Sequence, residues 1–307
     1  MTATPIIFDC DPGVDDAVAL LLAFASPELE LLAITTTAGN VSGTLTARNA
    51  RLIRQLAGRE DVPVHIGAER PLVREPVEAG AFHGESGLGA LPIAEPALPV
   101  TSGDAVQAII DIVRARPEGS VTLVVTGPMT NAALALQRAP DLAARLKAIV
   151  AMGGARSEGG NITASAEFNI FADPHAADVV CRSGVTIVAF GLDATHQVRA
   201  TEARIAAIEA LGNPLADAAA SLLRFSREVE RQVVHGLDAP LHDPCPIAWL
   251  IRPSLFELRP CRLDVETGSP LTMGHTAVEF RAPEPNAQWA VKADADGLFA
   301  LLTERLA

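Results

Sequence analysis

The stretch Pro5-Ile-Ile-Phe-Asp-Cys-Asp-Pro-Gly-Val-Asp-Asp-Ala-Val-Ala-Leu-Leu-Leu-Ala-Phe-Ala-Ser26 joins a short apolar run to four aspartates and then to a second, longer apolar pattern. Residues 5–8 predict a buried strand, and residues 15–26 predict a helix with apolar side chains at 17, 18, 21, 22 and 24. A strand that passes through a polar turn into a helix is the unit from which parallel α/β sheets are built.

The same alternation continues to about residue 190. Further strands are expected at 31–35, 62–66, 121–125, 148–152 and 185–190, and further helices at 44–57, 103–114, 131–137 and 174–183. Pro63 indicates either that the strand at 62–66 lies at a sheet edge or that Pro63 stands at the start of this strand. Alternating strands and helices predict the α/β class, with a mostly parallel, Rossmann-like sheet and helices on both faces. No repeat, low-complexity tract or linker divides residues 1–307, so we expect a single domain with a helical and mixed C-terminal part.

Composition excludes several classes of protein. The chain has 24 basic and 37 acidic residues and a net charge of −13, which argues against nucleic acid or an anionic membrane as partner. Four cysteines at 10, 181, 245 and 261 form no CxxC pair, which fits a reducing compartment without a zinc site. The longest apolar run, 17–25, is about half a membrane span, and the N-terminus shows no signal peptide pattern. We therefore expect a cytoplasmic globular protein.

The segment 71–101 interrupts the alternating pattern. It contains five prolines between 71 and 99 and glycines at 80, 84, 87 and 89. Such a stretch in a compact domain is either a functional lid or a tolerated surface loop. The polar sequence His83-Gly-Glu-Ser-Gly87 favours a lid, because it places polar groups between flexible glycines.

The four aspartates at 9, 11, 15 and 16 are the strongest chemical signal. Carboxylates this close repel one another, and burying them is costly without a cation. Oxygen-only ligation favours Ca²⁺ or Mg²⁺ over zinc. Alternatively, Asp15 or Asp16 caps the N-terminus of a helix, but this leaves Asp9 and Asp11 unexplained.

Polar residues also follow the later strands, where ligands bind in parallel sheets. They are Asn40, Thr126 and the Met152-Gly-Gly154 turn, followed along the chain by Asn161, Glu167 and Asn169. Amide and carboxylate groups of this kind bind vicinal hydroxyls, although a polar loop contains them too. A second signal is Leu241-His-Asp-Pro-Cys245, in which Asp243 would complete a metal site and His242 would donate a proton. The alternative is that Asp243 caps the helix that follows, beside a hydrogen-bonded histidine.

Seven segments together resemble the inosine-uridine preferring nucleoside hydrolase family, in order and at its spacing. They are Asp9-Cys-Asp-Pro-Gly-Val-Asp-Asp16, Thr37-Ala-Gly-Asn40, His83-Gly-Glu-Ser-Gly87, Thr126-Gly-Pro-Met-Thr-Asn131, Met152-Gly-Gly154, Ala166-Glu-Phe-Asn169 and His242-Asp-Pro-Cys245. The resemblance implies that residues 1–307 form one catalytic domain, which cleaves the N-glycosidic bond of ribonucleosides with water to give ribose and a free base. It also implies a role in nucleoside salvage, a small-molecule nucleoside as partner, and a homo-oligomer, either a tetramer or a dimer.

The resemblance further assigns roles to residues. Ca²⁺ would be held by Asp11, Asp16, Asp243 and the Thr126 carbonyl, with Asp11 also the general base toward water. The ribose hydroxyls would be bound by Asp15, Asn40, Asn161, Glu167 and Asn169, with Met152 beneath the sugar. His242 would be the acid for purine leaving groups, and His83 would lie in the mobile loop over the base; which of the two protonates the leaving base stays open.

The chain departs from the family pattern because it has no tyrosine, whereas several relatives carry tyrosines on the helix before the His-Asp-Pro-Cys segment. The corresponding helix, about 214–234, offers Phe225, Arg227, Glu230 and Arg231, followed by His235. The segment Asp238-Ala-Pro-Leu-His242 resembles the pyrimidine-leaning members of the family, which favours uridine and cytidine as substrates and leaves inosine possible. Two rival functions are a Ca²⁺-dependent nucleoside or ribose binder without catalysis and an aspartate-dependent phosphatase. The two lysines, Lys147 and Lys292, are poorly placed for the phosphatase.

Overall fold

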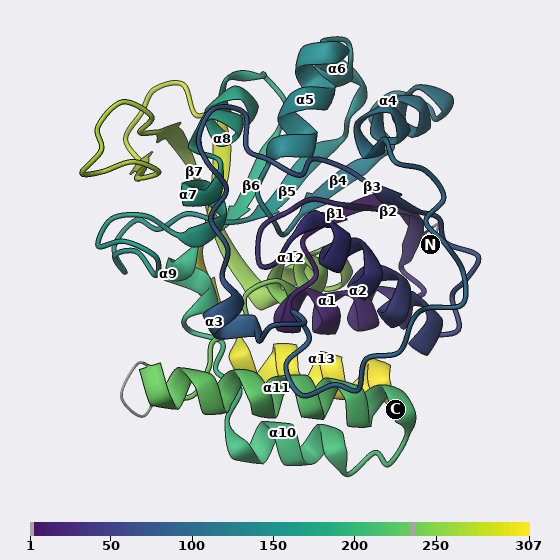
Figure 1. The fold of residues 1–307 in the computed structure, drawn as a ribbon. Coiled ribbons are helices and arrows are strands. Elements are labelled where there is room, and N and C mark those ends of the chain that lie inside the picture. Colours follow the sequence, from purple (N-terminus) through teal and green to yellow (C-terminus); the bar gives the residue numbers. More distant parts are fainter. Residues whose placement is uncertain (1–2, 234–236) are drawn as a thin grey trace.

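A computed structural model describes residues 3–233 and 237–307 (Figure 1). Within these ranges nine strands form one sheet in the order β3-β2-β1-β4-β5-β6-β9-β7-β8. The strands are β1 (Thr4–Cys10), β2 (Leu29–Thr36), β3 (Val64–Ile66), β4 (Thr122–Val125), β5 (Ala148–Met152), β6 (Ile187–Phe190), β7 (Phe256–Val265), β8 (Thr276–Glu279) and β9 (Ala287–Ala293). The first six strands and β9 are parallel, and β7 and β8 are antiparallel additions at one edge.

The helices of the described chain cover both faces of this sheet. They are α1 (Val14–Phe24), α2 (Gly43–Leu56), α3 (Gly80–His83), α4 (Ala105–Ala115), α5 (Thr130–Arg138), α6 (Leu142–Arg145), α7 (Phe168–Ala172), α8 (Pro174–Arg182), α9 (Leu192–Thr195), α10 (Glu202–Glu209), α11 (Pro214–Val233), α12 (Pro244–Ile251) and α13 (Ala295–Leu306), with a 3₁₀ turn η1 (Pro253–Leu255). Figure 1 shows α4, α5, α6 and α8 on one side of the sheet and α1, α2, α10, α11, α12 and α13 on the other.

Alternate residues of the central strands enter two separate cores. Ile6 and Phe8 of β1 pack with α1, α12 and α13, whereas Ile7 packs with α4, α5 and α8. This alternation is the pleat of a strand that is buried on both faces. It confirms the predicted fold class, a single-domain α/β fold with a mostly parallel sheet.

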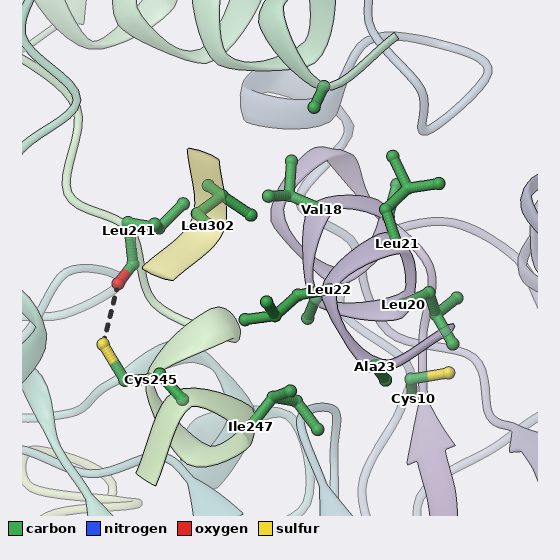
Figure 2. Close-up of a cluster of buried hydrophobic side chains, with 14 of the residues drawn as sticks. Cys10, Val18, Leu20, Leu21, Leu22, Ala23, Leu241, Cys245, Ile247 and Leu302 are labelled. Atoms are coloured by element: carbon green, nitrogen blue, oxygen red, sulfur yellow. Dashed lines mark hydrogen bonds between the residues drawn. The ribbon is translucent and has the colours of Figure 1, made fainter. Parts of the chain in front are cut away.

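Beyond its first turn, which carries Asp15 and Asp16, helix α1 is apolar around its whole circumference, as is typical of a helix buried among other elements. Figure 2 shows Val18 and Leu22 of α1 facing Leu302 of α13, with Ile247 of α12 beneath them, and all four are buried. The N-terminal strand and helix are thereby fixed in the centre of the molecule, so the turn between them, which carries the aspartates, is held from both ends.

The order β3-β2-β1-β4-β5-β6 is that of a doubly wound sheet, in which the strand order reverses between β1 and β4. Ligands bind in the crevice that this reversal opens beyond the carboxyl ends of the strands. The aspartate turn follows β1, and Thr126 follows β4. The topology therefore brings these two segments together at the point where a ligand site is expected.

Every strand and helix expected before residue 190 is present, with ends shifted by a few residues. As Pro63 indicates, β3 begins at Val64 and is an edge strand. The segment 71–101 contains only the short helix α3 and no strand. The expected helix at 214–234 is α11, although Val234 and His235 lie outside the described residues. No helix of the described chain is both long enough and apolar enough to cross a membrane.

Candidate active site

A cavity of about 450 Å³ opens at the carboxyl ends of the parallel strands. Ten of the candidate residues line it: Asp15, Asn40, His83, Thr126, Met152, Asn161, Glu167, Asn169, His242 and Asp243. The two remaining candidates, Asp11 and Asp16, are fully buried and do not line the cavity. Residues from all seven of the segments that resemble the family thus meet at one place, whereas Lys147 and Lys292 do not line the cavity.

Asp16 accepts hydrogen bonds from residues that follow three different strands, β1, β2 and β4. Its Oδ2 accepts hydrogen bonds from the Gly13 amide and from Nδ2 of Asn40, both at 3.0 Å. Its Oδ1 accepts the hydroxyl of Thr126 at 2.7 Å. The bond from Gly13 is a capping interaction at the start of α1, so the capping interpretation of Asp16 is correct. This interaction leaves a role of Asp16 in a metal site open.

The carboxylates that converge are those of Asp15, Asp16 and Asp243, whose oxygens lie within 4.8 Å of one another. Asp11 is not a member of this group. Its Oδ2 accepts the Asn40 amide at 2.7 Å, while its Oδ1 is buried without a hydrogen-bond partner. The backbones of Gly39 and Gly127 press on the two oxygens so closely that a Cβ at either position would overlap the carboxylate.

Burial raises the pKa of each aspartate in this cluster, and mutual repulsion adds to the effect at Asp11, Asp16 and Asp243. The pKa of Asp16 rises to about 6. Among the described residues, the only basic group within 4 Å of these carboxylates is His83, whose Nδ1 lies 3.9 Å from Asp15 Oδ1. Protein groups therefore leave the negative charge uncompensated.

These residues fit a hard divalent cation. Two buried carboxylate oxygens, Asp11 Oδ1 and Asp15 Oδ1, have no hydrogen-bond partner. All the candidate ligands are oxygens, as Ca²⁺ and Mg²⁺ require. The Thr126 carbonyl accepts Nδ2 of Asn169 at 2.7 Å, and a carbonyl oxygen has a second lone pair for a further interaction. The acidic cluster could thus hold a metal ion.

Glu167 and the asparagines build the wall of the cavity. Glu167 is the N-cap of α7 and accepts the amides of Asn169 and Gly154, each at 2.9 Å. Burial raises its pKa to about 7 in spite of these bonds. Asn161 accepts the amide of Phe168 at 2.9 Å. Each side chain is held by at least one backbone group, so the polar wall is preorganised.

Both candidate histidines are neutral. Nδ1 of His83 accepts the Val14 amide at 3.1 Å, which places the ring proton on Nε2. Burial lowers the pKa of His83 to about 4. Nδ1 of His242 lies 2.8 Å from the Thr195 hydroxyl, and burial together with His196 and Arg199 lowers its pKa to about 3. Each ring can therefore donate a hydrogen bond without carrying a charge.

The far end of the cavity was only partly predictable. It is lined by the apolar Phe82, Ile162, Val229, Val233 and Pro240 and by the polar Ser226, His196 and Glu230. Of the α11 residues noted in the sequence, only Glu230 reaches the cavity, at 3.8 Å from Arg199.

The other α11 residues noted in the sequence lie away from the cavity. Arg227 pairs with Asp238 at 2.6 Å, and Phe225 packs against the core. Arg231 is exposed. His196, whose Nδ1 lies 3.1 Å from Glu158, was missed because a single histidine after a strand has no distinctive spacing.

Comparison with known proteins agrees with this geometry. Residues 6–300 match the family model described as inosine-uridine preferring nucleoside hydrolase. The chain is 46% identical over 308 residues to the pyrimidine-specific ribonucleoside hydrolase RihA of Salmonella agona, covering 99% of this chain and 98% of the relative. It is also 44% identical to an uncharacterized protein of Schizosaccharomyces pombe, with 98% of each chain covered.

Solved structures give the same result. The purine-preferring ribonucleoside hydrolase from Gardnerella vaginalis has a TM-score of 0.92 at 33% identity and 98% coverage of both chains. A plant nucleoside hydrolase, PpNRh1, also has a TM-score of 0.92, at 31% identity, with coverage of 99% of this chain and 98% of that one. The chain therefore belongs to the inosine-uridine preferring nucleoside hydrolase family. It is an N-glycosidase that hydrolyses ribonucleosides, which confirms the resemblance and the predicted enzyme class.

Proposed function

We propose that this enzyme hydrolyses pyrimidine ribonucleosides, with Ca²⁺ at the aspartate cluster and Asp11 as general base. The observation that carries the proposal is that Asp15 and Asp243 of the acidic cluster, the polar wall and two histidines line one cavity. The 46% identity to a relative whose name specifies pyrimidines, against 33% to one named as purine-preferring, supports the base preference.

The cation would be held by Asp11, Asp16, Asp243 and the Thr126 carbonyl, and the position of Asp15 in the converging group adds it as a candidate ligand. When bound, Ca²⁺ would lower the pKa of a coordinated water and offset the negative charge of the cluster. Ca²⁺ fits better than Mg²⁺, because its flexible coordination tolerates carboxylates already fixed by other bonds.

Asp11 is the carboxylate best suited to accept a proton. One of its oxygens is fixed by the Asn40 amide, and the other is free of hydrogen bonds. In the proposed step a water oxygen bonds to C1′ of the ribose, its proton passes to Asp11, and the bond from C1′ to the base nitrogen breaks. The transition state resembles an oxocarbenium ion, which the surrounding carboxylates stabilise.

Ribose would lie against Met152, with its hydroxyls facing Asp15, Asn40, Asn161, Glu167 and Asn169. These side chains are fixed before substrate arrives, so little conformational entropy is lost on binding. The departing base would occupy the apolar end of the cavity, take the electron pair of the broken bond and be stabilised by a hydrogen bond from the neutral ring of His242 or His83. Transfer of a full proton would require that ring to be in its imidazolium form when the bond breaks.

We expect replacement of His242 by alanine to reduce hydrolysis of inosine more than that of an aryl riboside whose leaving group needs no proton. A positioned acid contributes about 10²–10⁴-fold to a reaction that requires it. Steady-state rates on both substrates measure the difference. Equal losses on the two substrates would remove His242 from the acid role and leave His83 as the candidate.

Base preference is tested by ribose release from uridine, cytidine, inosine and adenosine under one set of conditions. We expect kcat/KM for uridine and cytidine to exceed that for inosine by about tenfold or more, since one well-placed contact is worth a factor of this size. A higher value for inosine would overturn the pyrimidine proposal. Retention of intact nucleoside without ribose release would instead indicate a binder.

We further infer that the enzyme acts as a homo-oligomer, a tetramer or a dimer, in the cytoplasm and in nucleoside salvage. The family resemblance supports the assembly and the salvage role. The four cysteines are free and buried, which fits a reducing compartment.

A further inference from the structure

Several side chains of helix α2 bind the segment 71–101, and one of them is a buried amide. Asn49 lies on α2 and is fully buried. Its Nδ2 donates to two backbone carbonyls, that of Pro12 at 2.9 Å and that of Ser86 at 2.8 Å. Its Oδ1 accepts the guanidinium of Arg48 at 3.0 Å, and the same guanidinium nitrogen also donates to the Ser86 carbonyl at 3.0 Å.

The Asn49 amide thus bridges two segments of the chain, and the first of them is the aspartate turn. Pro12 follows Asp11 directly, and the next amide, that of Gly13, donates to Asp16 at 3.0 Å. The orientation of the Pro12 carbonyl fixes the peptide plane that it shares with Gly13. Asn49 therefore holds the backbone between two of the aspartates.

The other end is the segment that carries His83. The Ser86 carbonyl belongs to a turn in which the Gly89 amide donates to the His83 carbonyl at 2.9 Å. The His83 ring in turn accepts the Val14 amide at 3.1 Å. The segment that Asn49 binds is therefore the same one from which His83 contacts the start of α1.

The chemistry of the position requires a primary amide. Two carbonyl oxygens need two N–H donors, which a carboxylate of the same shape does not supply. Gly87, with a φ of 83°, packs so closely on Nδ2 of Asn49 that an added Cβ would lie 2.6 Å from it. Gly87 therefore packs directly against the Asn49 amide.

We propose that Asn49 is a positioning residue for the N-glycosidase reaction, which couples the seating of the His83 segment to the geometry of the aspartate turn. The proposal rests on the proposed function of His83 and the aspartates. It assigns to Asn49 no contact with substrate.

The test is the near-isosteric Asn49→Asp, which keeps an acceptor for Arg48 but removes both donors. We expect kcat/KM for uridine to fall about tenfold to a hundredfold, the effect of a small misplacement of catalytic groups. Amide hydrogen exchange across residues 80–89 should become faster at the same time. The matched control is Gln55→Ala, which breaks a bond from α2 to the Ala97 amide at 2.7 Å in the exposed part of the segment and should leave kcat/KM unchanged.

A double-mutant cycle with His83→Ala separates positioning from general destabilisation. If Asn49 acts through His83, Asn49→Asp should cost much less in the His83→Ala background than in the wild type. Fully additive losses, or a wild-type kcat/KM in Asn49→Asp, would overturn the proposal. Hydrogen exchange does not depend on turnover, so unchanged exchange across residues 80–89 would overturn it even if the wild type released no ribose. Absence of ribose release by itself would instead refute the proposed function.

Discussion

Replacement of Asp11 by alanine is expected to lower kcat/KM for uridine by up to about 10⁴-fold, the upper range for loss of a general base. The carboxylate is buried, one of its oxygens has no hydrogen-bond partner, and its neighbours are themselves acidic. Its removal takes away the proposed base, and the neighbouring carboxylates are already assigned to the cation and the ribose. The same variant should bind Ca²⁺ more weakly, because it removes a proposed ligand.

The fold should survive this change. The Asp11 side chain makes one hydrogen bond, to the Asn40 amide, and an unpaired buried amide costs about 1–3 kcal/mol. Asp11→Asn keeps an acceptor for that amide, so it should lose activity with even less effect on the melting temperature. Asp141→Asn, at an exposed carboxylate paired with Arg114 at 2.5 Å, is the matched control and should retain full activity. Wild-type turnover in Asp11→Ala would contradict the proposed mechanism.

Removal of the metal is expected to abolish activity and to lower the melting temperature. Without a cation the carboxylates of Asp11, Asp15, Asp16 and Asp243 are buried close to one another with only a neutral histidine beside them. Binding at a free concentration 100 times Kd stabilises the folded state by about 2.7 kcal/mol. For 307 residues, at about 2.1 cal/mol/K of unfolding entropy per residue, that corresponds to a shift of roughly 4 °C.

The measurement is metal analysis of the purified enzyme, followed by chelation and readdition of a single cation. We expect about one calcium per chain, full recovery with Ca²⁺ and weaker recovery with Mg²⁺, which demands a more regular octahedral geometry. Full activity and an unchanged melting temperature in the metal-free enzyme would show that the aspartate cluster does not work through a cation.

Much of the fold could be predicted because its signals are local. The strands β1 to β6 are short apolar runs, and α1 and α2 begin where the predicted helices begin to within about a residue. The site could be predicted in outline because the aspartate turn and Thr126 follow strands that a parallel sheet places side by side.

Other features depend on tertiary contacts that a single sequence does not reveal. Helix α7 has five residues and is defined by the Glu167 cap, which is itself fixed by the Gly154 amide. Asp15, rather than Asp11, converges with Asp16 and Asp243, and the Asp11 carboxylate instead packs against Gly39 and Gly127 of two other loops. Asn49 has the spacing of an ordinary polar residue on a helix, and only the fold shows that it bridges two carbonyls.

The most direct test of the account is a crystal structure of Asp11→Ala grown with Ca²⁺ and uridine, because this variant should bind substrate without consuming it. We predict one cation at the carboxylates of Asp15, Asp16 and Asp243, and intact uridine in the cavity with its ribose against Met152 and its base toward α11. A cation or a nucleoside bound elsewhere, with this cavity occupied by water alone, would contradict the proposal that the cavity is the active site.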